Sequence, residues 1–364
     1  MSVYNYTGDA LTYAYDVLGT TLQYAYDVDG NEVLSGDPPE EPWVKTLLRY
    51  DTNYIITEAW LANATIQRNA VMAAYSANNI PFFIQTDGHG KKNEGNKGCH
   101  NLAEETMRYI ANMQLGDWAS YYSDGANATE HISTSNGITN YLPVMGNHEF
   151  LKAVQSDPTA DLTQLVASFV PLDAGYINPT YGYWKKLDTK KHVKYLGTQP
   201  HIPDDNNSSG FIGKFTSDQW EWVIDELEAN DGYDIVILQH EPFGGTYTRL
   251  DNSETETWTG GNYNLSPVFA ARKAKTSGSV TDADGVTHTY DFSGCTSDFL
   301  CVFHGHTHYV MYMDKTQFGY PVYVADDFDN DKTSCYGLID RDNGKLKIWR
   351  FGQSGVENVF ELEL

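Results

Sequence analysis

Residues 141–149 read Tyr-Leu-Pro-Val-Met-Gly-Asn-His-Glu, and this stretch decides the fold class. The apolar residues at its start predict a short buried strand, and the polar residues Gly146-Asn147-His148-Glu149 follow where that strand ends. Open α/β sheets place their active sites just beyond the carboxyl ends of the strands. The stretch therefore predicts an α/β protein with a functional site at a sheet edge.

The same arrangement occurs on both sides of this stretch. Phe82-Phe-Ile-Gln-Thr predicts a buried strand that runs into Asp87-Gly-His89. Residues 233–239 form a second apolar run, rich in β-branched side chains, that ends at His240. Both runs place ionisable side chains where a strand stops, so we expect them at the same sheet edge.

Two further segments complete the series. Residues 298–303 predict a strand that is followed by His304 and then by Gly305-His306-Thr307-His308. We expect His304 either to be packed inside the protein or to support a neighbouring site residue. Gly116-Asp117 follows a helix that we expect over residues 102–113. Each motif means little alone, but their fixed order along one chain indicates a common site.

The remaining pattern alternates helices with strands. A helix is expected over residues 57–79, with its buried side drawn from Leu61, Ile66, Val71, Met72 and Tyr75. A third helix is expected to begin after Thr216, whose hydroxyl is a good N-cap. Asp284-Gly285 and residues 342–344 predict hairpin turns. We expect one α/β domain over residues 43–364.

The first residues carry a different pattern. Residues 11–19 are echoed by residues 22–30, and both copies contain Tyr-Ala-Tyr-Asp-Val with apolar side chains at alternate positions. This tyrosine-rich, three-fold 11-residue repeat predicts a small β-meander, and the Pro-rich residues 36–42 predict a linker. Residues 1–42 are then either an edge sheet packed on the main domain or a module for attachment or oligomerisation.

Composition limits the function classes. A chain of 364 residues with 41% apolar and 20% charged residues can form a large core, which excludes a disordered protein. The formal charge of −25 repels nucleic-acid backbones and anionic membranes. No secretory signal and no membrane-spanning stretch is visible, which leaves the cytoplasm or the surface of a cell or particle as the location.

The ordered series D-x-H, G-D, G-N-H-E, H and G-H-x-H resembles the calcineurin-like metallophosphoesterase superfamily over residues 82–308. The resemblance implies a four-layer α/β/β/α sandwich of two mixed sheets flanked by helices. It also implies two transition metal ions (Mn, Fe or Zn). Their implied ligands are Asp87, His89 and His308 for the first ion, Asn147, His240 and His306 for the second, and Asp117 as the bridge.

The same resemblance implies hydrolysis of a phosphomonoester or phosphodiester by in-line attack of a metal-bridging hydroxide. His148 would assist the leaving group, and Glu149 would orient His148 or shape its loop. Purple acid phosphatases within that superfamily have a tyrosine three residues after the bridging aspartate, where this chain has Ser120. A tyrosine–iron charge-transfer site is therefore not expected.

Two functions remain open at this point. The first is a phosphoesterase that acts on a small phosphoester or on a diester in a sugar-rich polymer, with no nucleic acid and no membrane as partner. The alternative is a phage-tail or cell-surface binding module that keeps the fold with little or no catalysis. The intact ligand series and the intact His148 favour the enzyme.

Overall fold

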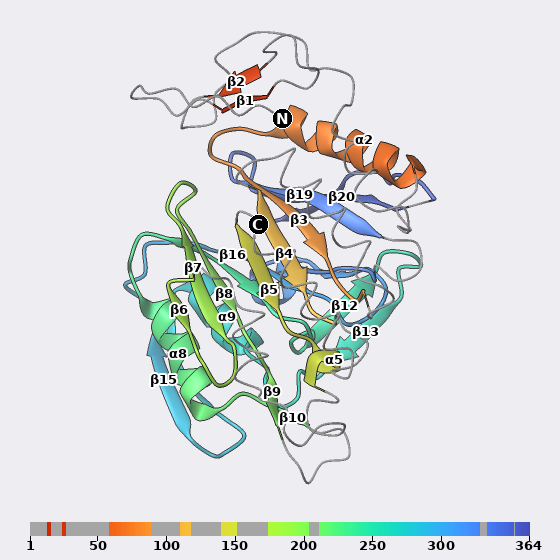
Figure 1. The fold of residues 1–364 in the computed structure, drawn as a ribbon. Coiled ribbons are helices and arrows are strands. Elements are labelled where there is room, and N and C mark those ends of the chain that lie inside the picture. Colours follow the sequence, from red (N-terminus) through yellow and green to blue (C-terminus); the bar gives the residue numbers. More distant parts are fainter. Residues whose placement is uncertain are drawn as a thin grey trace.

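The computed structural model describes residues 13–15, 24–26, 58–88, 110–117, 140–150, 174–203, 211–327, 333–352 and 354–364. Two large mixed sheets dominate this part of the chain (Figure 1). One has six strands in the order β21 (Phe360–Glu363), β20 (Lys345–Phe351), β19 (Ser334–Asp340), β3 (Ile80–Gln85), β4 (Ala111–Leu115) and β5 (Tyr141–Val144).

The other sheet has nine strands. Their order is β13 (Thr255–Trp258), β12 (Gly245–Arg249), β17 (Met311–Met313), β18 (Val322–Val324), β16 (Phe299–His304), β11 (Asp234–Leu238), β8 (Val193–Gly197), β7 (Trp184–Asp188) and β6 (Tyr176–Ile177). Two small hairpins accompany it, β9 (His201–Pro203) with β10 (Phe211–Gly213) and β14 (Ser277–Thr281) with β15 (Thr287–Asp291). The helices in the described ranges are α2 (Glu58–Ala74), α5 (Asn147–Phe150), α8 (Ser217–Glu228), α9 (Ser266–Ala274) and α10 (Lys315–Phe318).

Three layers of apolar side chains hold four layers of secondary structure together. Phe82 and Ile84 of β3 pack between the two sheets, in a core shared with strands of the nine-stranded sheet. Phe83, between them in sequence, points to the opposite face and packs under α2. This alternation is the period of two that a strand buried on both faces requires. Helices α8 and α9 cover the outer face of the nine-stranded sheet. The predicted α/β/β/α sandwich is confirmed.

Parallel pairing brings the functional segments to one edge. In the six-stranded sheet, β3, β4 and β5 are parallel, and in the nine-stranded sheet β8, β11, β16 and β18 are parallel. Parallel strands end on the same side, so the residues that follow them lie together. Every sequence motif follows one of these strands.

Of the residues predicted for the buried side of the first helix, Val71 is buried, whereas Ile66, Met72 and Tyr75 are exposed. The side chain of Leu61 lies outside the described part of the structure. Helix α2 buries Trp60, Ala64, Gln67 and Val71, whereas Ile66 and Met72 are 53% and 48% exposed. The Gln67 amide donates to the backbone oxygens of Arg350 (2.8 Å) and Glu357 (2.6 Å), which ties the helix to the strand beneath it. A polar residue therefore lies in the middle of the packed face. For this reason, locating the buried face by its apolar residues alone gives the wrong face.

Substitution on α2 should separate the two faces. Trp60 is fully buried and its ring lies 5.0 Å from that of Phe351, so Trp60→Ala should lower the free energy of unfolding by about 3–5 kcal/mol. Ile66→Ala, on the exposed face, should change it by less than about 0.5 kcal/mol. Urea denaturation of both variants checks the assignment, and equal losses would contradict it.

Other expectations have mixed outcomes. The helix expected over residues 102–113 is wrong at its end, because Ala111–Leu115 form β4, a strand buried along its whole length. Thr216 does cap α8, with its hydroxyl accepting from the Gln219 N–H at 3.2 Å. Both predicted hairpin turns join antiparallel pairs, β14 with β15 and β19 with β20.

Part of the N-terminal repeat pattern is present. Strands β1 (Tyr13–Tyr15) and β2 (Tyr24–Tyr26) pair antiparallel, with Tyr13 opposite Tyr26. A third strand and the Pro-rich linker lie outside the described residues, so the division at residue 42 stays a prediction. Among the helices in the described ranges, none combines the length and apolar character needed to cross a membrane.

Candidate metal centre

Glycines let the strand ends approach one another. A Cβ atom on Gly146 would lie 2.1 Å from Asp117 Oδ1, and one on Gly305 would lie 2.1 Å from Thr86 Oγ1 and 2.9 Å from Asp87 Oδ2. Gly116, at φ +95°, would meet His240 Nδ1 at 2.5 Å. Any side chain at these positions would push a functional group away. The glycines of the motifs are therefore steric requirements of the site.

Asp117 lies at the middle of the assembly. It follows β4 with its carboxylate buried, and its Oδ1 accepts a hydrogen bond of 2.8 Å from the backbone N–H of His148. The buried Glu149 carboxylate accepts from the N–H groups of Asp117 (2.9 Å) and Gly146 (2.7 Å). Glu149 thus fixes the loop after β5 against the loop after β4, the loop-shaping role named for it above.

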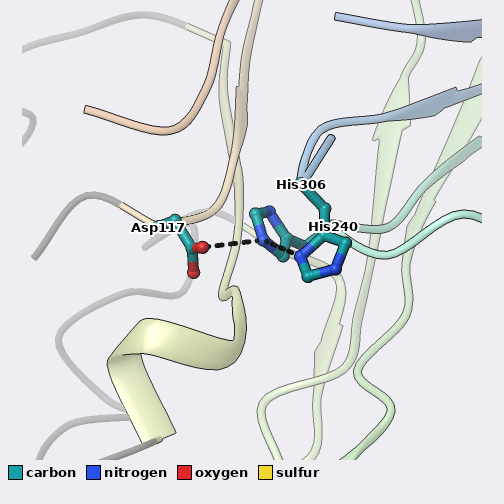
Figure 2. Close-up of side chains that lie close together, drawn as sticks. All are labelled: Asp117, His240 and His306. Atoms are coloured by element: carbon teal, nitrogen blue, oxygen red, sulfur yellow. Dashed lines mark hydrogen bonds and ion pairs between the residues drawn. The ribbon is translucent and has the colours of Figure 1, made fainter. Parts of the chain in front are cut away.

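Two histidines of the nine-stranded sheet face Asp117. His240 Nε2 lies 3.1 Å from Asp117 Oδ2, and His306 Nδ1 lies 3.2 Å from His240 Nε2 (Figure 2). His240 Nδ1 contacts the carbonyl oxygen of Leu115, which only accepts, so Nδ1 carries the proton. Nε2 is therefore the nitrogen that would bind a metal ion, after it has lost any proton that it carries. Asn147 Oδ1 lies 3.0 Å from His306 Nδ1.

Asp87 and His308 form the other side of the group. Asp87 is fully buried, and its Oδ2 accepts from Thr86 Oγ1 (2.6 Å) and from the backbone N–H of His306 (2.8 Å). Its Oδ1 lies 3.5 Å from His308 Nε2 and 3.9 Å from His240 Nε2. The side chains of Asp87, Asp117, Asn147, His240, His306 and His308 are called the candidate metal centre from here on.

Backbone strain is concentrated in this centre. Asp87, Asp117, His306 and His308 all have positive φ angles, between 52° and 77°. A left-handed backbone at residues other than glycine is unfavourable and persists only where the surroundings enforce it. Its occurrence at four residues of one group is typical of a functional site.

Burial and neighbouring charges set the protonation of these groups. Burial raises the pKa of Asp87 to about 6, and the charge of Asp117 adds to the effect. Burial acts the same way on Asp117, but the positive charge of His240 and the hydrogen bonds from His240 and from the His148 backbone together outweigh it and lower that pKa below its usual range. The two carboxylates raise the pKa of His240 despite its burial. The centre thus stabilises positive charge between its carboxylates.

The donor atoms fit a transition metal ion. Asp117, His240 and His306 each direct one ligand atom into a group in which all three atoms lie within 4.8 Å of one another. Carboxylate oxygen with imidazole nitrogen suits zinc, iron or manganese. The fixed proton on His240 Nδ1 leaves Nε2 as the nitrogen that faces this group.

Most of the predicted site residues meet here. The residues of the centre and His148 come together from both sheets, whereas His89 and Ser120 lie outside the described residues. The ligand roles of His89 and of the residues of the centre stay predictions. His304 is packed, as expected: it is buried against Phe243 with ring centroids 4.9 Å apart, and burial lowers its pKa to about 3.

Sequence reasoning missed two groups beside the centre. Asp327 follows β18, and its Oδ2 lies 3.4 Å from His308 Nδ1. His201 forms a buried ion pair with Glu241, the residue after His240, and this pair helps to lower the pKa of Glu241 to about 2 against the effect of burial. Neither belongs to a motif, and only the sheet topology brings them to the site.

A methyl group at Gly146 should dismantle the centre. Because the added Cβ would overlap Asp117 Oδ1, Gly146→Ala should weaken metal binding by more than about 10-fold, since even outer-shell changes have effects of that size. Gly294→Ala is the control, because a Cβ there meets nothing within 4 Å. Metal titration of both variants gives the comparison. Equal affinities would show that Gly146 does not set the position of Asp117.

Neither a family model nor a curated protein matches the sequence. Similar solved structures include a predicted phosphoesterase from Streptococcus pneumoniae, at 10% identity and a TM-score of 0.33, covering 79% of this chain and 98% of the other. The phosphopantetheinyl hydrolase of Mycobacterium tuberculosis matches at 12% identity and a TM-score of 0.35, covering 69% and 91%. A protein serine/threonine phosphatase from Saccharomyces cerevisiae matches at 10% identity and a TM-score of 0.31, covering 88% and 95%. At these TM-scores the likeness carries no conclusion about activity, which has to come from the residues of the centre.

Proposed function

We propose that this chain is a metal-dependent phosphoesterase that hydrolyses a phosphomonoester or phosphodiester. One observation carries the proposal: ligand atoms of Asp117, His240 and His306 converge within 4.8 Å, although the residues come from two different sheets. Asp87 and His308 extend this group on one side and Asn147 on the other. The motif series that resembles the calcineurin-like metallophosphoesterases supplies all of these residues.

The ligands divide into two sets that share Asp117. Asn147, His240 and His306 would hold one metal ion, and Asp87, His308 and His89 would hold the other. Manganese, iron and zinc all suit such mixed nitrogen and oxygen donors. Metal ions held by these residues would lower the pKa of bound water and neutralise charge on a phosphoryl group.

His148 is the residue suited to assist the leaving group. Its backbone N–H is fixed to Asp117 Oδ1, and its Nε2 lies 3.9 Å from Asp117 Oδ2. Its side chain is 28% exposed, so a substrate can reach it, unlike the buried ring of His240. An imidazole placed there can donate a proton to the alcohol oxygen as the ester bond breaks.

Charge favours a small or weakly charged substrate. The excess of 49 acidic over 24 basic residues opposes the approach of a polyanion such as duplex DNA. Beside the centre, Arg249 is bound by Asp251 at 2.8 Å and approached by Glu256 at 3.6 Å, so its charge is offset. The aromatic ring of Trp258, 5.8 Å from that of His306, offers a surface for a sugar or another ring.

Metal analysis combined with a substrate screen tests the proposal. We expect purified protein to contain transition metal, and to hydrolyse small synthetic phosphoesters with manganese or a similar ion. Active wild-type protein without transition metal would overturn the proposed mechanism. Efficient, salt-insensitive cleavage of duplex DNA, faster than that of small esters, would overturn the proposed substrate class.

A further inference from the structure

Asp327 reaches the candidate metal centre from a strand that carries no motif. Strand β18 is parallel to β16, and the Ala325 N–H donates to the carbonyl oxygen of His304 at 2.8 Å, so the two strand ends stay together. Two residues after Ala325, the Asp327 side chain is 6% exposed. Its Oδ2 lies 3.4 Å from Nδ1 of His308.

The His308 ring therefore lies between two carboxylates. Nδ1 faces Asp327, and Nε2 faces Asp87 Oδ1 at 3.5 Å. A neutral imidazole carries one proton, and a carboxylate outside the centre attracts it to Nδ1. The lone pair on Nε2 then points into the centre.

We propose that Asp327 is a positioning residue that sets the tautomer and orientation of His308 for metal binding. The proposal rests on the proposed function, because it assigns Asp327 a role only if His308 is a ligand. Asp327 would do for His308 what the Leu115 carbonyl does for His240.

His308 has particular need of such a partner. Its side chain is 45% exposed and its backbone has φ +57°, whereas His240 is fully buried. A half-exposed ring on a loop has more rotamers to lose when it binds a metal, so a fixed carboxylate behind it raises affinity by reducing that loss.

The neighbouring acid has a different task. Asp326 Oδ2 lies 2.9 Å from Arg350 Nη2, and its Oδ1 accepts from the backbone N–H of Asp327 at 3.0 Å. Asp326 thus fixes the backbone to β20, while Asp327 faces the centre. Because each of these two adjacent acids has its own partner, both can be mostly buried.

Metal affinity tests the proposal without an activity assay. Asp327→Asn keeps the shape but offers an N–H to Nδ1, which favours the wrong tautomer. We expect one metal equivalent to bind about 10–100-fold more weakly and the other to be unchanged, as measured by competition with a chelator. Asp327→Glu keeps the carboxylate and should restore part of the affinity.

Two comparisons separate this role from general damage. Asp282→Asn breaks another buried carboxylate–imidazole contact, 3.0 Å from His288 Nε2, in the β14–β15 hairpin, and should leave metal affinity unchanged. In a His308→Ala background, Asp327→Asn should have no further effect on metal binding. An additional loss there, or wild-type affinity in Asp327→Asn alone, would overturn the role of Asp327 and leave the phosphoesterase proposal standing. A wild-type protein that binds no metal would overturn both.

Discussion

Asp117→Asn should remove most metal binding and nearly all hydrolysis. The Asp117 carboxylate is buried between the two ligand sets, with Oδ2 at 3.1 Å from His240 Nε2. Loss of a residue that only orients a ligand weakens metal binding by about 10–100-fold, so loss of a shared charged ligand should exceed about 100-fold. The amide that replaces it also lacks the negative charge that stabilises cations on either side.

A second variant shows whether Asp117 is shared. His308→Ala removes a ligand on one side only and should mainly empty one site, whereas Asp117→Asn should weaken both. Elemental analysis after dialysis against limiting metal gives the number of ions that each variant retains. If Asp117→Asn keeps two equivalents of metal, Asp117 is not the bridge.

His148→Ala should lower kcat by about 10²–10⁴-fold and leave the metal content intact, which is the usual effect of losing a positioned acid. The reason is geometric: the backbone N–H of His148 is bonded to Asp117 Oδ1, and its ring is partly exposed. His148 does not belong to the group of three ligand atoms that Asp117, His240 and His306 form. The loss should be larger for an alkyl ester than for a nitrophenyl ester, because nitrophenolate leaves without a proton.

Steady-state kinetics on the two esters measures this difference. His192→Ala serves as the control and should keep wild-type rates, because His192 is an exposed turn residue whose ring is tilted against that of Tyr233, with centroids 5.8 Å apart. Full turnover of the alkyl ester by His148→Ala would show that another group protonates the leaving alcohol.

The motifs predict which side chains come together, because the position of each motif is decided locally. Each motif follows a strand, so its place at the sheet edge depends only on that strand being parallel to its neighbours. The order of Asp87, Asp117 and Asn147 along the chain matches the order of β3, β4 and β5 in the sheet. The α/β/β/α architecture follows from the resemblance, and the three apolar layers confirm it.

Errors arise where burial is decided by distant partners. Met113 and Leu115 suit a helix as well as a strand. They form part of a strand because β4 pairs in parallel with β3 on one side and with β5 on the other. On α2, the Gln67 contacts with β20 and the segment that follows it turn the packed face away from Ile66. No local pattern contains that information.

For the same reason, the sequence alone does not place Asp327 or the His201–Glu241 pair at the site. They follow β18, β8 and β11, and they meet the motif residues because these strands and β16 lie side by side in the order β18, β16, β11 and β8. A single sequence does not state which strands are neighbours.

The pairing of β3 with β19 has a consequence for the order in which the protein matures. Asp87 follows β3, an inner strand whose partner on one side, β19, is translated only after His306 and His308. During synthesis on the ribosome, every residue of the candidate metal centre emerges before β19, the strand that pairs with β3 next to Asp87. Non-local pairing of this kind forms late in folding. Metal acquisition is therefore expected to be a post-translational event, governed by the metal supply that the finished chain encounters.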